Sequence, residues 1–457
     1  MKSTILVSAL LVFSCLMGCA TYTDLIEGGL MQYESGRMDG ALNSFAAAEA
    51  ETSDTHLVQL EKGMTVLALN NPRQAVAEFT KAINKMDTLT TGSAVSDAAS
   101  YVLDDTVADY PGAPFEQISA RFFLGLSYLM MANPFENVSA ACRDMDNKME
   151  QIEAYYERTY QFDAEGNEAE FSFQIPPVAK YFAALAAEQR GEFDSAEIYL
   201  RQAIAGAPGC GFFRSEAERM RAGTQQNLVF VFALVGLVPH KIETESQELT
   251  ALLQGMKALY SIAEPENSPH ALDRVALTAP VRIPGYPKQK PFWHGGFDVG
   301  VPGGTTDTTA MVADFDSYAR AEYEMMLPGI LIRAAVRRVI KEAAGHAAGS
   351  SMTEDGDAGK LIGDLFASIA SAAETIDTRS WCTLPREVHA CRLQVAQETE
   401  TIFVAPRGTN GNRSGQNIDI SLDLSDPSPA FILVIQPGRG MAPIVLVDEA
   451  HRPKAQP

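Results

Sequence analysis

The chain has 457 residues, long enough for two or three domains at about 150 residues each. Hydrophobic residues make up 46% of it, which suffices for a large buried core. Its 36 lysines and arginines are outnumbered by 58 aspartates and glutamates, so the formal net charge is -22 at pH 7. A protein this acidic lacks the basic face that phosphate backbones require, which excludes nucleic acid as the expected partner.

The chain begins with the layout of a secretion signal. A single basic residue, Lys2, precedes an apolar run from Ile5 to Leu16. A membrane-spanning helix needs roughly 20 apolar residues, so this run is too short to remain in a bilayer. We expect residues 1–18 to be a signal peptide that is removed from the mature chain.

The stretch Leu16-Met17-Gly18-Cys19 resembles the bacterial lipobox. The resemblance implies cleavage before Cys19 and a diacylglycerol on its thiol, so that acyl chains supply the membrane affinity. Ala20 follows the cysteine, and lipoproteins that lack Asp at this position resemble those sorted to the outer membrane. The alternative is an ordinary cleavable signal in which Cys19 occurs by chance.

A repeat follows the signal. The segments GGLMQYESGRMDGALNSFAAAEA and KGMTVLALNNPRQAVAEFTKAIN align with a shift of 34 residues, the period of the tetratricopeptide repeat. The alignment pairs Gly29 with Gly63, Ala41 with Ala75, Phe45 with Phe79, and Ala48 with Ala82. Small residues at these positions let two antiparallel helices approach closely, and the phenylalanine fills the space to the next helix.

Two further copies extend the array. Residues 181–208, YFAALAAEQRGEFDSAEIYLRQAIAGAP, repeat the spacing clearly, and residues 124–145, LGLSYLMMANPFENVSAACRDM, repeat it less regularly. Each helix pair hides its apolar stripe only by stacking on a neighbour. The sequence therefore predicts a tetratricopeptide-like α-solenoid of four helical pairs over residues 19–225.

After about residue 226 the apolar period changes from 3.6 to 2, which indicates strands. The run LVFVFALVGLV from Leu228 to Val238 is too short to cross a bilayer and is typical of a buried strand. In NIDISLDLS, alternate residues from Ile418 to Leu424 are apolar. Strands are expected at residues 229–235, 274–283, 401–405, 418–424, 431–435 and 444–447, and helices near 316–346 and 359–375. The predicted class is thus α+β multidomain, with a β-rich module over 226–450 and a tail over 451–457.

The first of these helices carries a basic stripe. Arg333, Arg337 and Lys341 recur at positions i, i+4 and i+8, opposite Ile332 and neighbouring apolar residues. One interpretation is a solvated face of a helix that packs its apolar side on the sheet. The other is a binding site for an anionic partner, which would be locally conspicuous on an acidic protein.

Three segments carry a family resemblance. They are DYPGAPFEQISARFFLGLSYL, LPGILIRAAVRRVIKEAAG and DTRSWCTLPREVHACRL. In order after the lipobox and the repeats, they resemble a family of bacterial lipoproteins that contain tetratricopeptide repeats and whose function is uncertain. The resemblance implies no established activity and no catalytic residues.

Cysteine usage leaves four thiols in the expected mature chain besides Cys19: Cys142, Cys210, Cys382 and Cys391. An oxidising periplasm permits disulfides. The eight residues between Cys382 and Cys391 are enough for a turn, so these two are the disulfide candidate. Unpaired thiols are the equally open alternative.

Motifs for catalysis are missing from the sequence. It contains no G-x-S-x-G, no S-x-x-K with suitable partners and no H-E-x-x-H, and its seven histidines are scattered. The glycine runs lack the strand, helix and lysine of a phosphate-binding loop. We therefore expect no catalytic residues, no metal site and no cofactor.

The segment from Asp377 to Trp381 offers the second half's candidates for exposed chemistry. Asp377 is placed to orient Arg379, and Trp381 to stack on a ligand. The alternative is that Trp381 anchors a loop on the core and that the Asp-Arg pair is a local salt bridge.

These features predict an outer-membrane lipoprotein that faces the periplasm and is held at the membrane by Cys19. Its repeats would offer a concave groove to an unknown protein or peptide, making it a scaffold or adaptor in envelope assembly, secretion or wall synthesis. Candidate partner-binding residues are Arg333, Arg337, Lys341, Arg379, Trp381 and Tyr128; further guesses for the groove lining are Gln32, Tyr33, Lys62, Val66 and Arg190.

The rival hypothesis is an envelope hydrolase acting on wall or polysaccharide. It would use carboxylates of the β-rich half such as Asp298, Asp314 and Asp316. Paired acids perform acid-base work when their carboxyls lie about 5–10 Å apart in a cleft. One sequence does not give that separation.

Overall fold

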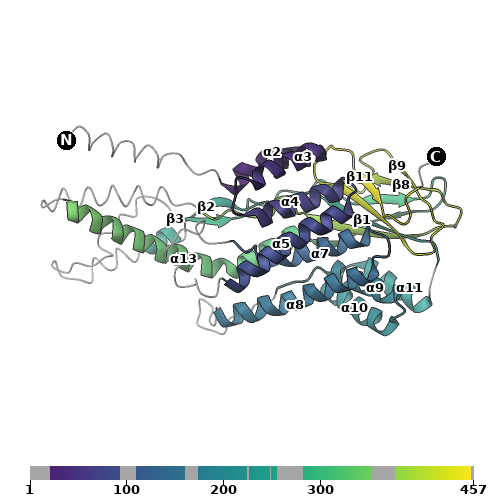
Figure 1. The fold of residues 1–457 in the computed structure, drawn as a ribbon, viewed down its shortest axis with the longest axis horizontal. Helices are drawn as coiled ribbons and strands as arrows, with labels where there is room; N and C mark the ends of the chain where they lie inside the picture. Colours follow the sequence, from purple (N-terminus) through teal and green to yellow (C-terminus); the bar gives the residue numbers. More distant parts are fainter. Residues whose placement is uncertain are drawn as a thin grey trace.

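A computed structural model describes residues 21–92, 110–159, 173–223, 226–247, 249–254, 281–352 and 376–453. The predicted signal peptide, Cys19 and the helix predicted over 359–375 lie outside these ranges. Within them the protein is a mixed α+β structure, with helices in the N-terminal half and strands in the C-terminal half, as predicted (Figure 1). Among the described helices, none combines the length and apolarity that a bilayer crossing requires.

The helices of the first half pack in consecutive pairs. Each pair is joined by a short turn and contacts the next pair along the chain. The pairs are α2 (Tyr22–Glu34) with α3 (Met38–Glu49), α4 (Thr55–Ala68) with α5 (Pro72–Gly92), α7 (Pro114–Leu129) with α8 (Phe135–Thr159), and α9 (Pro177–Gln189) with α10 (Phe193–Gly206), followed by α11 (Gly211–Ala222).

The contacts within the first two pairs repeat with the sequence. A Cβ atom on Gly29 would lie 2.5 Å from the ring of Phe45, and one on Gly63 would lie 2.7 Å from the ring of Phe79. Any larger side chain at either glycine would push the two helices of its pair apart. The same close contact therefore recurs after 34 residues, as the alignment requires.

The described strands of the second half form three sheets. The five-stranded sheet has the order β11 (Ile444–Val447), β10 (Ala430–Gln436), β1 (Leu228–Val235), β7 (Glu387–Gln394) and β6 (Ala310–Asp314). The four-stranded sheet has the order β5 (Thr306–Thr308), β4 (Phe297–Gly300), β8 (Thr401–Pro406) and β9 (Ile418–Ser421), and β2 (Ile242–Ser246) pairs with β3 (Val281–Gly285). Most predicted strands are confirmed; of the one over 274–283, only the end is described, in β3.

The central position of strand β1 accounts for its continuous apolar sequence. It is parallel to β10 and antiparallel to β7, and all eight of its residues are buried. Phe230 and Phe232 face the core shared with the helices, whereas Val229 and Val231 face the core shared with the four-stranded sheet. A strand buried on both faces reads as a continuous apolar run rather than an alternating one.

The molecule therefore has three layers: helices, five-stranded sheet and four-stranded sheet. One hydrophobic core joins residues of the helical half to residues of the five-stranded sheet. The long helix α13 (Phe315–Met352) and the β2–β3 hairpin project from one end of this body, and β8, β9 and β11 lie toward the other end (Figure 1).

Candidate functional site

A segment of the second half lies inside the helical array. We call residues 377–383 the docked segment. The carboxylate of Glu61 on α4 accepts hydrogen bonds from the backbone N–H groups of Cys382 and Thr383, both at 2.8 Å. The carboxylate of Glu116 on α7 accepts one from the N–H of Trp381 at 2.7 Å. Both glutamates are fully buried, so two carboxyl groups of the helical half are matched to three backbone donors of the docked segment.

Trp381 packs against aromatic residues of α5 and α7. Its ring centroid lies 6.0 Å from that of Phe79 and 5.6 Å from that of Phe123, and the side chain is 2% exposed. The indole nitrogen donates to the hydroxyl of Thr383 at 3.0 Å. Trp381 therefore anchors the segment on the core, which is the second of the two interpretations of its role, and it is not available to stack on a ligand.

Arg379 is buried near the N-terminal ends of α4 and α7. Its guanidinium donates to Asp377 at 2.9 and 2.8 Å and to Asp54 at 3.2 Å, and it lies 5.2 Å from the centroid of the Tyr110 ring. Burial lowers the pKa of this group, but the hydrogen bonds and charges of Asp377 and Asp54 outweigh burial and hold the pKa above its ordinary value. The predicted pairing with Asp377 is present; the contribution of Asp54, from the helical half, was missed.

Of the two alternatives for Cys382 and Cys391, the structure shows unpaired thiols and not the candidate disulfide. Cys382 is buried in the core shared with the helices, and Cys391 of β7 is buried in the core between the two larger sheets. The five-stranded sheet separates these cores, so a short connection in sequence does not bring the thiols together. Burial raises the pKa of both thiols, that of Cys391 to about 12.

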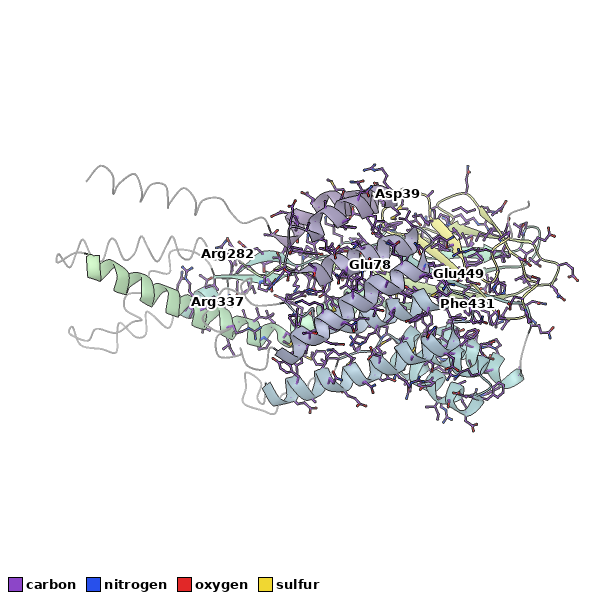
Figure 2. The ribbon with its side chains drawn as sticks, viewed as in Figure 1. Asp39, Glu78, Arg282, Arg337, Phe431 and Glu449 are labelled. Carbon is purple, nitrogen blue, oxygen red and sulfur yellow. The ribbon has the colours of Figure 1, made fainter. Side chains whose placement is uncertain are left out.

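A cavity of about 320 Å³ lies beside the docked segment, where α13 leaves the body. Its described lining comes from the N-terminal end of α7, the β2–β3 hairpin, α13 and the docked segment. Five of these lining residues are basic, namely Lys241, Arg282, Arg333, Arg337 and Arg379, whereas two, Glu322 and Asp377, are acidic. Figure 2 shows Arg282 and Arg337 at the same end of the molecule, on the hairpin and on α13.

The cavity thus brings together Arg333, Arg337 and Arg379, which the sequence had placed on two separate features. Lys341 lies in α13, but its side chain is outside the described part of the chain. Tyr128 lies at the far end of α7 and packs half-buried against the core, so it is not part of this site.

The expectation that the basic stripe of α13 forms a solvated face is wrong for Arg337. Arg337 is 2% exposed, whereas Ile332, which was expected to face the sheet, is 56% exposed. The reason is that α13 packs on the hairpin: Ala334 shares a small apolar cluster with Val281 and Ile283 of β3. The hairpin therefore determines which side of the helix is covered.

Lys241 places a positively charged ammonium in the cavity. Its ammonium donates to the neutral hydroxyl of Tyr110 at 3.2 Å and lies 4.8 Å from the centroid of that ring. Among the described residues it forms no ion pair. No sequence pattern indicates this group, because Lys241 stands alone in a loop far from Tyr110 along the chain.

Glu322 of α13 is one of the two acidic residues that line the same cavity. It accepts a hydrogen bond from the backbone N–H of Phe115 at 2.7 Å. Burial raises its pKa well above the ordinary value, the charge of Glu116 raises it further, and Lys241 opposes the rise. Burial therefore favours the neutral acid, which leaves the basic side chains dominant in the cavity.

The three carboxylates of the hydrolase hypothesis take part in ion pairs and a helix cap. Asp298 accepts from Arg407 and Arg413, both at 2.7 Å; burial raises its pKa, but these hydrogen bonds outweigh burial and hold the pKa below its ordinary value. Asp314 accepts from the N–H of Ser317 at the start of α13, and Asp316 pairs with Arg320 at 2.6 Å. Within the described ranges, no group of three or more His, Cys, Asp or Glu is placed to hold a metal ion.

Comparisons with known proteins add no assignment. No protein-family model matches the chain, and a search of the curated proteins finds no significant match. The resemblance to lipoproteins with tetratricopeptide repeats therefore stays a prediction from the sequence.

Proposed function

We propose that this protein is a lipid-anchored adaptor that faces the periplasm from the outer membrane and binds an acidic segment of a partner protein at the cavity beside α13. The observation that carries the proposal is the ammonium of Lys241, which lies in a 320 Å³ cavity bonded to a neutral hydroxyl. Four arginines line the same space in a chain whose net charge is -22. Arg282 pairs with Glu243 and Arg379 with Asp377 and Asp54, so Lys241 is the group on which the proposal rests. Such a local reversal of charge attracts and orients an acidic partner.

The helical half is the scaffold in this account. The recurring contacts of Gly29 with Phe45 and of Gly63 with Phe79 support a tetratricopeptide-like array. Its inner face is taken by the docked segment, which changes where a partner is expected. Tyr33 and Val66, two of the residues suggested for a groove lining, are 1% and 0% exposed and so are core residues. We therefore place the partner at the cavity instead of the repeat groove.

The membrane anchor rests on the sequence Leu16-Met17-Gly18-Cys19. A diacylglycerol on Cys19 would hold the start of α2 close to the bilayer, since only a few residues separate Cys19 from Tyr22. The hydrolase hypothesis is not proposed, because Asp298, Asp314 and Asp316 act in ion pairs and a helix cap.

Charge reversal tests the partner site. The double variant Lys241→Glu with Arg333→Glu places acids in the cavity and should abolish recovery of a partner in pull-downs from crosslinked native envelopes. The matched control is Lys81→Glu with Arg201→Glu, which reverses two exposed charges on α5 and α10, whose side chains are 57% and 66% exposed. Equal recovery with both double variants would contradict the proposed site.

A further inference from the structure

A second hollow lies in the β-rich half and shares none of its described lining with the cavity. It is a cleft of about 980 Å³ bounded by three loops. These loops are residues 291–293 before β4, residues 406–418 between β8 and β9, and residues 436–443 between β10 and β11. Its size is at the upper end of the range for ligand sites in proteins, roughly 300–1,000 Å³, which suits an extended ligand.

One wall of the cleft carries an aromatic platform. Trp293 is one of only two tryptophans in the chain and is half-buried. Its ring is held by Phe292, at a centroid distance of 5.6 Å, and by His294, at 5.1 Å. The position of the indole is therefore fixed while part of its surface remains accessible.

Another part of the lining is rich in neutral hydrogen-bonding groups. The loop after β8 contributes exposed hydroxyl and amide side chains, namely Thr409, Asn410, Asn412, Ser414, Gln416 and Asn417. Amides and hydroxyls both donate and accept, so they match ligands that carry many hydroxyls. The described lining of the cleft includes two arginines, Arg413 and Arg439, and no Asp or Glu, although acids outnumber bases in the whole chain.

The polar loop is held in shape by its own contacts. Arg413 donates to Asp298 at 2.7 Å and to the side-chain oxygen of Asn417 at 3.0 Å. The N–H of Gly408 donates to the carbonyl of Asn412 at 2.9 Å, which closes the tip of the loop. These bonds place the side chains before any ligand arrives and so reduce the entropy lost on binding.

The floor of the cleft is an uncharged polar group. Gln436, at the end of β10, is 4% exposed and lines the cleft. Its side-chain oxygen lies 3.0 Å from Nε2 of His294, and its amide nitrogen donates to the carbonyl of Met441 at 2.9 Å. Burial and the nearby His389 lower the pKa of His294 to about 4, so the floor stays neutral at physiological pH.

We propose that this cleft binds a polysaccharide strand. The apolar face of one sugar ring stacks on Trp293, and the amides and hydroxyls of the loop hydrogen bond to sugar hydroxyl and acetamido groups. Arg413 and Arg439 add donors for carboxylate-bearing sugars. Most glycoside hydrolases use a pair of acids, and the described lining of the cleft holds no Asp or Glu, so we assign it to binding and not to hydrolysis.

Cosedimentation with purified, protein-free cell-wall sacculi and fluorescence titration with an N-acetylglucosamine hexamer test this proposal on the full-length protein in detergent. We expect binding to at least one of the two probes. The variant Trp293→Ala and the exposed double variant Asn412→Ala with Gln416→Ala should each weaken that binding at least tenfold. Phe193→Ala, which removes an aromatic ring that is 56% exposed on α10, is the matched control and should bind like the wild type.

The outcome separates this proposal from the adaptor function. Lys241→Glu with Arg333→Glu should leave polysaccharide binding unchanged, because none of the cavity's described residues lines the cleft. Absence of binding to both probes would overturn the proposal. So would binding that survives in both cleft variants, provided that circular dichroism shows them folded.

Discussion

The carboxylate of Glu61 on α4 accepts the backbone N–H of Cys382 at 2.8 Å, across 321 residues of sequence. The same side chain accepts the N–H of Thr383 and lies 3.3 Å from the hydroxyl of Tyr22. One fully buried glutamate thus joins the first helix, the second helical pair and the docked segment of the β-rich half.

Glu61→Ala should destabilise the whole protein. The substitution leaves the buried N–H groups of Cys382 and Thr383 without an acceptor, and each such orphan costs about 1–3 kcal/mol. We expect the free energy of unfolding to fall by about 2–5 kcal/mol in urea denaturation followed by circular dichroism. Glu51→Ala, at an exposed position after α3, is the control and should change it little. A loss no larger than that of the control would contradict the role given to Glu61.

Stability should fall as pH rises through neutrality. Burial raises the pKa of Glu61 to about 7 from an ordinary value of 4.5, although its hydrogen bonds oppose the rise. Between these values the folded state holds a proton that the unfolded state has lost, so the stabilisation is full below pH 4.5 and is lost as pH rises through 7. The difference amounts to about 3 kcal/mol at most.

Glu61→Gln removes the titration. The N–H groups of Cys382 and Thr383 donate to different oxygens of Glu61, so the glutamine amide nitrogen faces one of them and lowers stability at every pH without adding pH dependence. Urea midpoints of wild type and variant should diverge between pH 5 and pH 8, with the wild type losing more stability. Parallel pH profiles would show that the Glu61 carboxyl does not titrate in this window. Comparing the two proteins cancels the contributions of other groups, such as His451, whose pKa is also raised.

The thiols give a chemical test of the corrected disulfide. Cys382 and Cys391 should both be alkylated after unfolding without reductant, and peptide mapping should find no 382–391 cross-link. In the folded protein both should react slowly, because they are 2% exposed and burial raises their pKa. A cross-linked peptide from periplasmic material would contradict the structure.

Lipidation of Cys19 can be measured directly. Metabolic labelling with palmitate should mark the wild-type protein and not Cys19→Ser, and the variant should leave the membrane fraction. Cys142→Ser, which changes a buried thiol of the helical half, is the control and should keep both the label and the membrane association. Palmitate on Cys19→Ser would exclude the lipobox interpretation.

Local patterns predicted much of the fold. The spacing of Gly29 and Phe45, repeated after 34 residues, placed the first helical pairs, because the close contact depends on residue types at fixed positions in two neighbouring helices. The apolar run of β1 predicted a buried strand. Both features depend on residues that lie near one another in the chain.

Pairings between distant segments were not predictable in this way. Strand β1 lies between β7 and β10, whose residues come more than 150 positions later, and no pattern within β1 specifies them. The burial of Arg337 follows from the β2–β3 hairpin packing on α13, which again joins separate segments.

The candidate site was predicted only in part for the same reason. Arg333, Arg337 and Arg379 were singled out, but Lys241 and Tyr110 come from two other segments, and neither these two nor Glu322 of α13 follows a motif. These residues come together only in the folded chain, where they line one cavity.

Site-specific photocrosslinking tests the central claim, binding of a partner at the cavity, most directly. A photoreactive residue in place of Met326, which lines the cavity, should capture one reproducible protein in native envelopes, and capture should vanish when Lys241→Glu is added. The same residue in place of Ile198, which is 52% exposed on α10, should not capture it. Capture of that protein from Ile198 but not from Met326, or capture that is unaffected by Lys241→Glu, would contradict the account.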